Sequence, residues 1–546
     1  MGMMSPAFFQ VVRCRSVMPL LSGPGRVVHA LAMVLVATFL VPGAARASVS
    51  ADNLIEAALQ SATQIPDANE RGLVISSIAE ERAKAADWPR ADRILDSIKE
   101  AAVKDDALTQ VALIAAGKGE AERAATLVAR IVDGDGRGDA SAAVAAALVR
   151  QGSVSAGIGL ARSVVDVEQR FRALVEVARA MAGRQDPAAG RVLDDALGLL
   201  GVIGEPGLVG RLRQTAAQAA IAMQDVPRAL AIADGIQEAP RRLQVLRRAA
   251  LAFARAGFGQ GAQAAADSAL DHLGDAPDAR EQAFILLDIG TALGLAGDQD
   301  QARQAFAGAV EAVRGLTPET LGEIESAVPG AAITGGLVGY GIESARGQAD
   351  MMVRDLALRG AVVALVEARR LAEAQAVASE IQDDQTRDAA LQALVNGAAD
   401  TGDLHLALGV IEAITGQQAR QSATGAVAER LARAGDAEAA FGALQRMAES
   451  PEREDVALEL ASIFADRGDV TAVTTAVADL QSTSNREIGA ANLAIAQLAS
   501  GDIVAALEAG RNLTEPTLRA LVMARIATDL GDSVLDVPPL APLSAD

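Results

Sequence analysis

Few residues of this 546-residue chain are of a type that does chemistry. Beyond residue 47 the only histidines are His272 and His405, and neither has a second His or a Cys at metal-site spacing. The single cysteine, Cys14, precedes this part, which therefore has no thiolate nucleophile, thiolate metal ligand or disulfide. Motifs for zinc proteases, phosphate loops, dinucleotide binding and the nucleophile elbow are also missing from the sequence. The sequence thus predicts a protein that is not an enzyme and has no catalytic residue, metal site or cofactor.

One acidic run, from Asp133 to Asp139, has some of the spacing of a calcium-binding loop. Arg137 stands where such a loop needs its third ligand, and Val144 stands where the bidentate glutamate belongs. We therefore interpret the run as a helix cap and turn.

Arginines recur along the chain at intervals that are mostly multiples of 33 residues. The positions are Arg71, Arg137, Arg170, Arg242, Arg354, Arg387, Arg420, Arg453, Arg486 and Arg519, with Lys104 at one further position. A cation near the start of a helix is unfavourable against the helix dipole, so each needs a partner. One interpretation is a brace, in which the guanidinium bonds a loop carbonyl or a neighbouring acid. The alternative is a ladder that holds an acidic peptide or anionic polymer, with Arg387, Arg420, Arg453 and Arg486 as candidate partner-binding residues. We favour the brace, since a stabilising device should occur in every repeat and a binding site in only a few.

The arginines belong to a repeat that organises the whole chain. The stretch from Arg387 to Ile414 predicts two helices separated by Gly402-Asp403, and its skeleton returns 33 residues later. Such self-similarity is typical of stacked helical hairpins. The glycine ends the first helix in a left-handed conformation, and the following acid caps the second helix. A small residue four positions later, Ala407 in this unit, allows the two helices to approach closely.

These features resemble the tetratricopeptide repeat (TPR), which has two helices, a Gly-Asp turn and small residues at matching positions. The resemblance covers Ser50 to about Asp532, although the period is 33 residues instead of the family's 34 and its aromatic positions are mostly aliphatic. It implies an all-α fold without strands, a right-handed solenoid of about fourteen TPR-like hairpins. It also implies a role in protein binding, although the family's peptide-binding residues are not matched.

A 72-residue step between two repeats, from Asp298 to Arg370, predicts an insertion. Because it is rich in glycine, we interpret it as a loop over the solenoid. The alternative is a docking or lid element that carries Leu337 and Tyr340. The predicted segments are a secretory signal peptide at 1–47, a solenoid at 48–315, the insertion loop at 316–349, a second solenoid at 350–532 and a disordered Pro-rich tail at 533–546.

The start of the chain has the pattern of a secretory signal. Arg26 precedes an apolar run from Val27 to Val41, and Ala45-Arg46-Ala47 predicts cleavage before Ser48. The run is short for a membrane span, which needs ~20 residues, although an uncleaved anchor is the alternative. A cysteine-free chain behind such a signal predicts a periplasmic protein with no transmembrane segment after cleavage.

The chain is acidic, with a formal net charge of −21. Because nucleic-acid binding needs a basic face, this charge argues against a nucleic-acid partner. The sequence therefore predicts a non-catalytic periplasmic scaffold that binds an envelope protein or an extended peptide. Two alternatives remain: an accessory subunit of a cell-wall (murein) enzyme or envelope assembly complex, and a structural self-assembling spacer.

Overall fold

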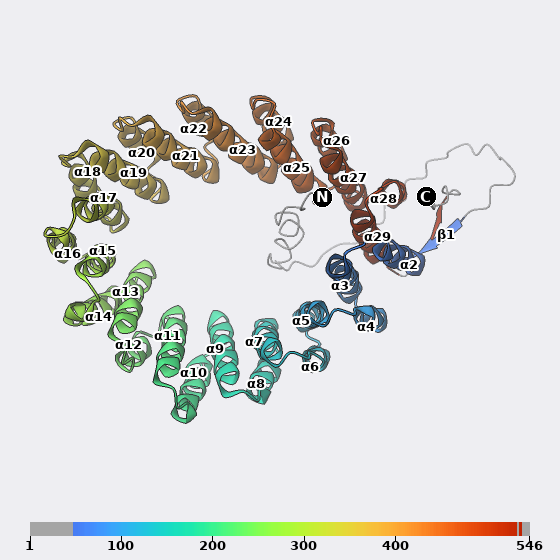
Figure 1. Cartoon of the computed structure of the whole chain (residues 1–546), viewed down its shortest axis with the longest axis horizontal. Coiled ribbons are helices and arrows are strands. Elements are labelled where there is room, and N and C mark those ends of the chain that lie inside the picture. Colours follow the sequence, from blue (N-terminus) through green and yellow to red (C-terminus); the bar gives the residue numbers. More distant parts are fainter. Residues whose placement is uncertain (1–46, 532–533, 538–546) are drawn as a thin grey trace. The chain divides into compact units, whose positions relative to one another are not determined.

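The computed structural model describes residues 47–531 and 534–537, which are almost entirely helices packed in pairs (Figure 1). In thirteen pairs an odd-numbered helix is followed in the chain by its partner: α3 (Ala68–Lys84) with α4 (Trp88–Ser97), α5 (Ala101–Gly117) with α6 (Ala121–Ala129), α7 (Gly134–Gln151) with α8 (Val154–Ser163), α9 (Val167–Gly183) with α10 (Ala189–Gly198), α11 (Pro206–Ala222) with α12 (Val226–Asp234), α13 (Ala239–Arg255) with α14 (Gly259–Asp271), α15 (Ala279–Leu295) with α16 (Gln299–Val313), α17 (Pro318–Thr334) with α18 (Val338–Arg346), α19 (Met351–Glu367) with α20 (Leu371–Ala378), α21 (Asp384–Asp400) with α22 (Leu404–Ile411), α23 (Gln417–Ala434) with α24 (Ala437–Gln445), α25 (Pro451–Ala465) with α26 (Val470–Ala478), and α27 (Thr483–Ala499) with α28 (Ile503–Arg511). The remaining two helices are α2 (Ala51–Thr63) and α29 (Pro516–Leu530), and two short 3₁₀ helices follow α10 (Leu199–Val202) and α14 (Leu273–Asp275). The prediction of an all-α helical repeat is confirmed.

The predicted left-handed turn residue is present in every chain-linked pair, although it is a glycine in only nine of the thirteen. One residue with a positive φ lies between the two helices, and the thirteen residues are Ala86, Gly119, Gly152, Gln185, Gln224, Gly257, Gly297, Gly336, Arg369, Gly402, Gly435, Gly468 and Gly501. In the α21–α22 pair Gly402 has a φ of +79°, and the Asp403 carboxylate accepts a hydrogen bond from the Leu406 N–H at 3.0 Å. The small residue four positions after the cap, Ala407, is fully buried where the helices cross. The repeat therefore follows from residues that can be read in the sequence.

Neighbouring pairs stack mainly through their odd-numbered helices, each of which contacts the odd-numbered helix before and after it. In Figure 1 these helices form the inner layer of the unit and the even-numbered helices the outer layer. Among the described residues, no helix is both long enough and apolar enough to cross a membrane.

The prediction of an insertion loop at 316–349 is wrong, because this segment forms the regular hairpin of α17 and α18. Gly336 takes the positive φ of the turn, +85°, so the 72-residue step contains two units instead of one unit and a loop. A Cβ at Gly330 would lie 3.2 Å from the carbonyl oxygen of Gly360, and one at Gly341 would lie 2.7 Å from that of Pro329. These glycines thus allow helices to approach closely, where the sequence suggested flexibility.

The described ends of the chain also differ from the prediction. Val534–Val537 forms a strand, β2, which pairs antiparallel with β1 (Ala47–Ser50) in the register Ala47 to Val537. The predictions of a strand-free fold and of a disordered tail are therefore wrong for these residues. The rest of the predicted tail, and the predicted signal peptide up to residue 46, lie outside the described residues.

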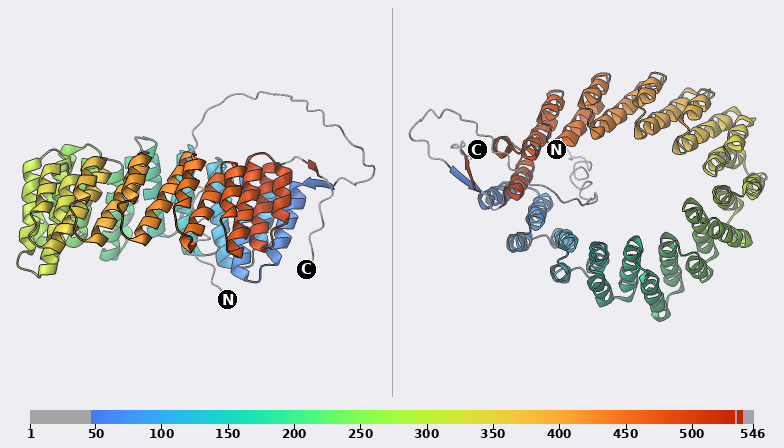
Figure 2. Two further views of the ribbon diagram at one scale, coloured as in Figure 1. Left: turned by 90° about the horizontal axis from the view of Figure 1, so that it is seen from above. Right: turned by 180° about the vertical axis from the view of Figure 1, so that it is seen from behind.

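Helices α2 and α29 form the fourteenth pair, although they come from opposite ends of the chain. Helix α29 packs against α2 and also against α3, and the first and last helices lie side by side in both views of Figure 2. Every described hairpin therefore has a neighbour on both sides, and the array formed by the helices from α2 to α29 is closed. The two solenoid segments predicted from the sequence are parts of this single closed array.

Candidate functional site

Seven of the ten arginines in the arginine column make internal side-chain hydrogen bonds, whereas Arg170 and Arg354 each have a buried Nε without a hydrogen-bond partner. Six of its members donate a hydrogen bond to the backbone carbonyl six residues earlier: Arg71, Arg137, Arg242, Arg387, Arg420 and Arg519. Arg453 instead bonds the Asp479 carboxylate at 2.9 Å. The brace is thus confirmed for these members, including three of the four candidate partner-binding arginines. The fourth, Arg486, is exposed and has no polar side-chain partner within residues 47–531, so its role stays untested.

Replacing Arg420 by alanine should lower the stability of the array. Its Nε donates to the Ile414 carbonyl at 2.9 Å, and loss of this charge-assisted bond should cost about 1–2 kcal/mol. Thermal unfolding followed by circular dichroism measures the effect. Arg446→Ala is the matched control, because Arg446 is exposed and has no polar side-chain partner among the described residues. Equal melting temperatures for the two variants would contradict the brace.

A second column, which sequence reasoning missed, stands one residue after the first. The Asp388 carboxylate accepts hydrogen bonds from the N–H groups of Thr415 and Gly416 at 2.9 and 2.7 Å and from the Thr415 hydroxyl at 2.9 Å. Burial raises the pKa of Asp388, but these three donors outweigh it, so its pKa lies below the usual value. In other repeats the equivalent acids accept hydrogen bonds from backbone N–H groups of the following loop. These acids are Asp105, Asp355, Glu454 and Glu487. The sequence signal for this second column is the recurrence of a basic residue followed directly by an acidic one, as in Arg387-Asp388.

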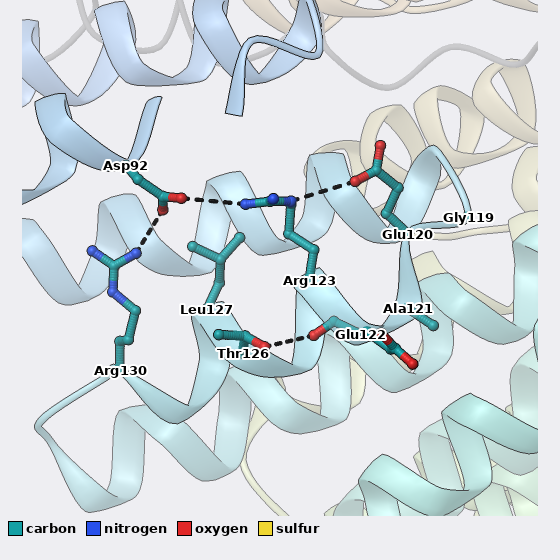
Figure 3. A pocket seen from close by; sticks show the side chains of 9 residues that line it. All are labelled: Asp92, Gly119, Glu120, Ala121, Glu122, Arg123, Thr126, Leu127 and Arg130. Carbon is teal, nitrogen blue, oxygen red and sulfur yellow. Dashed lines mark hydrogen bonds and ion pairs between the residues drawn. The ribbon is translucent and has the colours of Figure 1, made fainter. Parts of the chain in front are cut away.

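Charged side chains converge at a cleft of about 650 Å³ on the layer of even-numbered helices (Figure 3). Asp92 accepts from Arg123 at 3.2 Å and from Arg130 at 2.7 Å, and Glu120 pairs with Arg123 at 3.4 Å. The only tryptophan, Trp88, donates to Glu120 at 2.9 Å. Because both arginines of this cleft are already paired with acids from neighbouring hairpins, we interpret it as a structural ion-pair network.

A second cleft, on the odd-numbered layer, has a different charge balance. It has a volume of about 790 Å³ and extends over four successive helices of that layer, α7, α9, α11 and α13. Each of the four contributes one arginine, and we call this cleft the arginine groove. Its lining residues are Asp139, Ala142, Ala143, Ala146, Arg150, Arg172, Glu176, Arg211, Leu212, Gln214, Thr215, Gln218 and Arg241.

Three of the four guanidinium groups of the arginine groove are only weakly engaged. Arg150 is exposed and has no polar side-chain partner among the described residues. Arg172 and Arg211 are each 54% exposed and pair only with an acid at the start of their own helix, in the case of Arg211 at 4.0 Å. Such exposed pairs contribute little free energy and are easily exchanged. Arg241 is more firmly held, because it donates to Gln214 at 2.8 Å and its Nε forms an ion pair with Glu238 at 3.6 Å.

The surroundings of the groove are basic although the chain is acidic. Residues 167–258 contain thirteen Arg and nine Asp or Glu, a local surplus of four positive charges in a chain of net charge −21. A concave site with a surplus of one sign of charge, here four arginines against Asp139 and Glu176, concentrates ions of the opposite sign. The arginine groove is therefore the candidate site for an anionic ligand.

The remaining candidates from the sequence lie elsewhere. Leu337 is 4% exposed and belongs to the core, and Tyr340 stacks on Phe306 with ring centroids 6.2 Å apart. Burial raises the pKa of Tyr340. The prediction that these two residues form a docking or lid element is wrong, because they pack within a hairpin. Of the residues singled out from the sequence, only Asp139, the last of the acidic run, lines the arginine groove, and the local change of charge was the signal that could have found it.

The described part of the chain contains no group of three or more His, Cys, Asp or Glu side chains that could hold a metal ion.

No protein-family model and no curated protein matches this chain. Among solved structures, the chain is similar to Ton1535 from Thermococcus onnurineus NA1, with 17% sequence identity, 59% of this chain and 99% of that chain covered, and a TM-score of 0.25. It is also similar to a circular tandem repeat protein with novel repeat topology and enhanced subunit contact surfaces, with 15% identity, coverages of 88% and 97%, and a TM-score of 0.15. These scores are too low to carry an argument about function. What the chain's own helices show is an all-α protein built of repeated helical hairpins.

Proposed function

We propose that the chain is a non-catalytic, TPR-like interaction scaffold that binds an extended acidic segment of a partner protein in the arginine groove. The observation that carries this proposal is the convergence of four arginines, three of them weakly engaged, from four successive helices in an otherwise acidic chain. The predicted signal peptide supports a periplasmic location, and hence an envelope protein as the partner.

The dimensions of the groove suit a short extended segment. Packed helices lie about 8–10 Å apart, so four neighbouring helices span roughly 30 Å. An extended chain covers about 3.3 Å per residue, so nine residues fit this span. Acids at every third position of such a segment would each lie near the arginine of one helix.

The other lining residues favour a peptide over a simple polyanion. The Gln218 side chain carries both hydrogen-bond donors and an acceptor, which suit the N–H and C=O groups of a peptide backbone, whereas Gln214 and Thr215 already bond within the array. A long polyanion would also extend beyond the groove onto a protein of net charge −21 and be repelled there.

The test uses a fluorescein-labelled nonapeptide with Glu at every third position and Ser elsewhere, and the same peptide with Gln in place of Glu. We expect the full chain to bind the Glu peptide, measured by fluorescence anisotropy, and to bind it more weakly as salt is raised. The double variant Arg172→Glu/Arg211→Glu should weaken binding by about 100-fold or more, since two favourable charge contacts become repulsive.

The matched control is Arg314→Glu, which reverses the charge of an exposed arginine (68% exposed) outside the groove and should leave binding nearly unchanged. Equal loss of binding in both variants would show a non-specific effect of net charge. Equal binding of the Glu and Gln peptides would refute an acidic ligand. The two rival functions, a cell-wall enzyme accessory and a self-assembling spacer, do not require any preference for acidic peptides.

A further inference from the structure

The pair formed by α2 and α29 differs from every other hairpin because no turn joins its helices. Its two members are separated by more than 450 residues of chain, whereas the other pairs are joined by short turns. Both helices bury apolar faces, including Leu54 and Ile55 of α2 and Met523 and Ile526 of α29. We call the contact of α29 with α2 and α3 the seam.

Polar contacts specify how the seam fits together. Like other arginines of the column, Arg519 of α29 donates to the carbonyl six residues earlier, that of Leu513. It also donates across the seam to Ser61 at 3.1 Å and to Gln64 at 2.6 Å. At the other end of α29, Arg82 of α3 donates to the Thr528 hydroxyl at 2.7 Å.

The burial of Arg82 also shows that solvent is largely excluded from the seam. The Arg82 side chain is 2% exposed, and its Nε has no hydrogen-bond partner. A further hydrogen bond, from the Thr517 hydroxyl to Glu70 at 3.1 Å, joins α29 to α3 in the same interface. The strands β1 and β2 add a backbone ladder between the two ends of the chain.

The seam is also the place in the described array where the two helices of one pair can separate without breaking a turn between them. Opening it would expose two complementary apolar surfaces, one on α29 and the other on α2 and α3. Because these surfaces are complementary, each can be covered either by the other end of the same chain or by that end of a second copy. If α29 alone is exchanged between two copies, each array keeps its fourteen pairs and the seam keeps the same contacts, which is the condition for domain swapping.

We propose that the seam is an exchangeable interface through which two copies of this chain close on each other, with α29 of each copy packed on α2 and α3 of the other. The partner at this surface is a second copy of the chain, and the proposal does not depend on the arginine groove. Closure within one chain benefits from a high effective concentration of its own end, so single copies dominate in dilute solution. The swapped pair forms when copies are unfolded and refolded together at high concentration.

Charge exchange at the Arg519–Gln64 contact tests this directly. Arg519→Glu removes the cation from one side, and Gln64→Arg places a second cation beside Arg519. Each variant alone has a poor seam. In a swapped pair of the two variants, one seam joins Glu at 519 to Arg at 64 and the other joins the native Arg519 to the native Gln64.

Two full-length variants, one carrying a mass tag, are refolded together and separated by size-exclusion chromatography with light scattering and native mass spectrometry. We expect mixed pairs to exceed the pairs formed by either variant alone by about tenfold. The control mixture is Arg346→Glu with Glu380→Arg, which breaks an ion pair at 2.5 Å between two chain-linked hairpins and should give no mixed pairs.

The double variant Arg519→Glu/Gln64→Arg on one chain should restore the single-copy form, with helix content checked by circular dichroism. Recovery of this double variant together with a mixture that stays single-copy would overturn the proposal. Mixed pairs in equal amount from the control mixture would also overturn it, because exchange would then not depend on the seam.

Discussion

Replacing Gly294 by alanine is expected to destabilise the array by about 2–3 kcal/mol, because the new methyl group would meet backbone atoms that cannot turn away. A Cβ at this position of α15 would lie 2.4 Å from the carbonyl oxygen of Gly335 and 2.7 Å from Leu337 Cδ1. The helices α15 and α17 would have to move apart. Denaturant unfolding followed by far-ultraviolet circular dichroism measures the change.

Gly159→Ala is the matched control, and its expected effect has the opposite sign. Gly159 lies in α8, and a Cβ there would have no neighbouring atom within 4 Å. Alanine should therefore stabilise the helix by about 0.5–1 kcal/mol through the lower entropy of the unfolded chain. If both variants lose stability to the same extent, the close approach of α15 and α17 is not what Gly294 provides.

The second large effect is expected from Asp388→Asn. The Asp388 carboxylate is 6% exposed and accepts three hydrogen bonds, whereas an asparagine would turn its NH₂ group toward at least one donor. An unsatisfied buried donor costs about 1–3 kcal/mol, which is the loss we expect at pH 7. Asp384→Asn, at a carboxylate that is 73% exposed, should have a much smaller effect.

The pH dependence of this variant follows from the direction of the pKa shift. The pKa of Asp388 is lower in the folded protein than the usual 3.8, so its charged form stabilises the fold above that value. This contribution is lost as the pH falls through the folded-state pKa. The difference in unfolding free energy between the native chain and Asp388→Asn should thus be constant from neutral pH down to about pH 5 and shrink at lower pH. A difference that grows on acidification would contradict the assigned role.

How much of this architecture the sequence predicts depends on whether a feature is local. The turn at Gly402-Asp403 and the crossing at Ala407 depend on residues within one hairpin, so the repeat pattern predicted them. The contact of Gly330 with Gly360 involves two hairpins, and a glycine does not reveal whether it provides flexibility or close approach. The segment 316–349 was therefore predicted to be a loop.

The candidate site was less predictable than the fold. Arg150 and Arg172 stand at different positions of their repeats, and only the stacking of α7 on α9 brings them to one groove. Residues that recur at one position of every repeat make stabilising contacts, because such contacts repeat with the fold. The arginines of the groove do not recur in this way. The seam was hidden for a similar reason, since α2 and α29 each look like half of an incomplete hairpin at an end of the chain.

The closure of the array also restricts how such a protein can change in length over evolutionary time. An open solenoid can gain or lose one repeat while the others keep their geometry, provided that its terminal repeats present a polar outer face. In this chain the last helix must meet the first, so one added hairpin would alter the angle between every pair of neighbours or break the contact of α29 with α2. Duplication of a single repeat is therefore disfavoured, and new functions are expected to arise by substitution on the surface of existing hairpins.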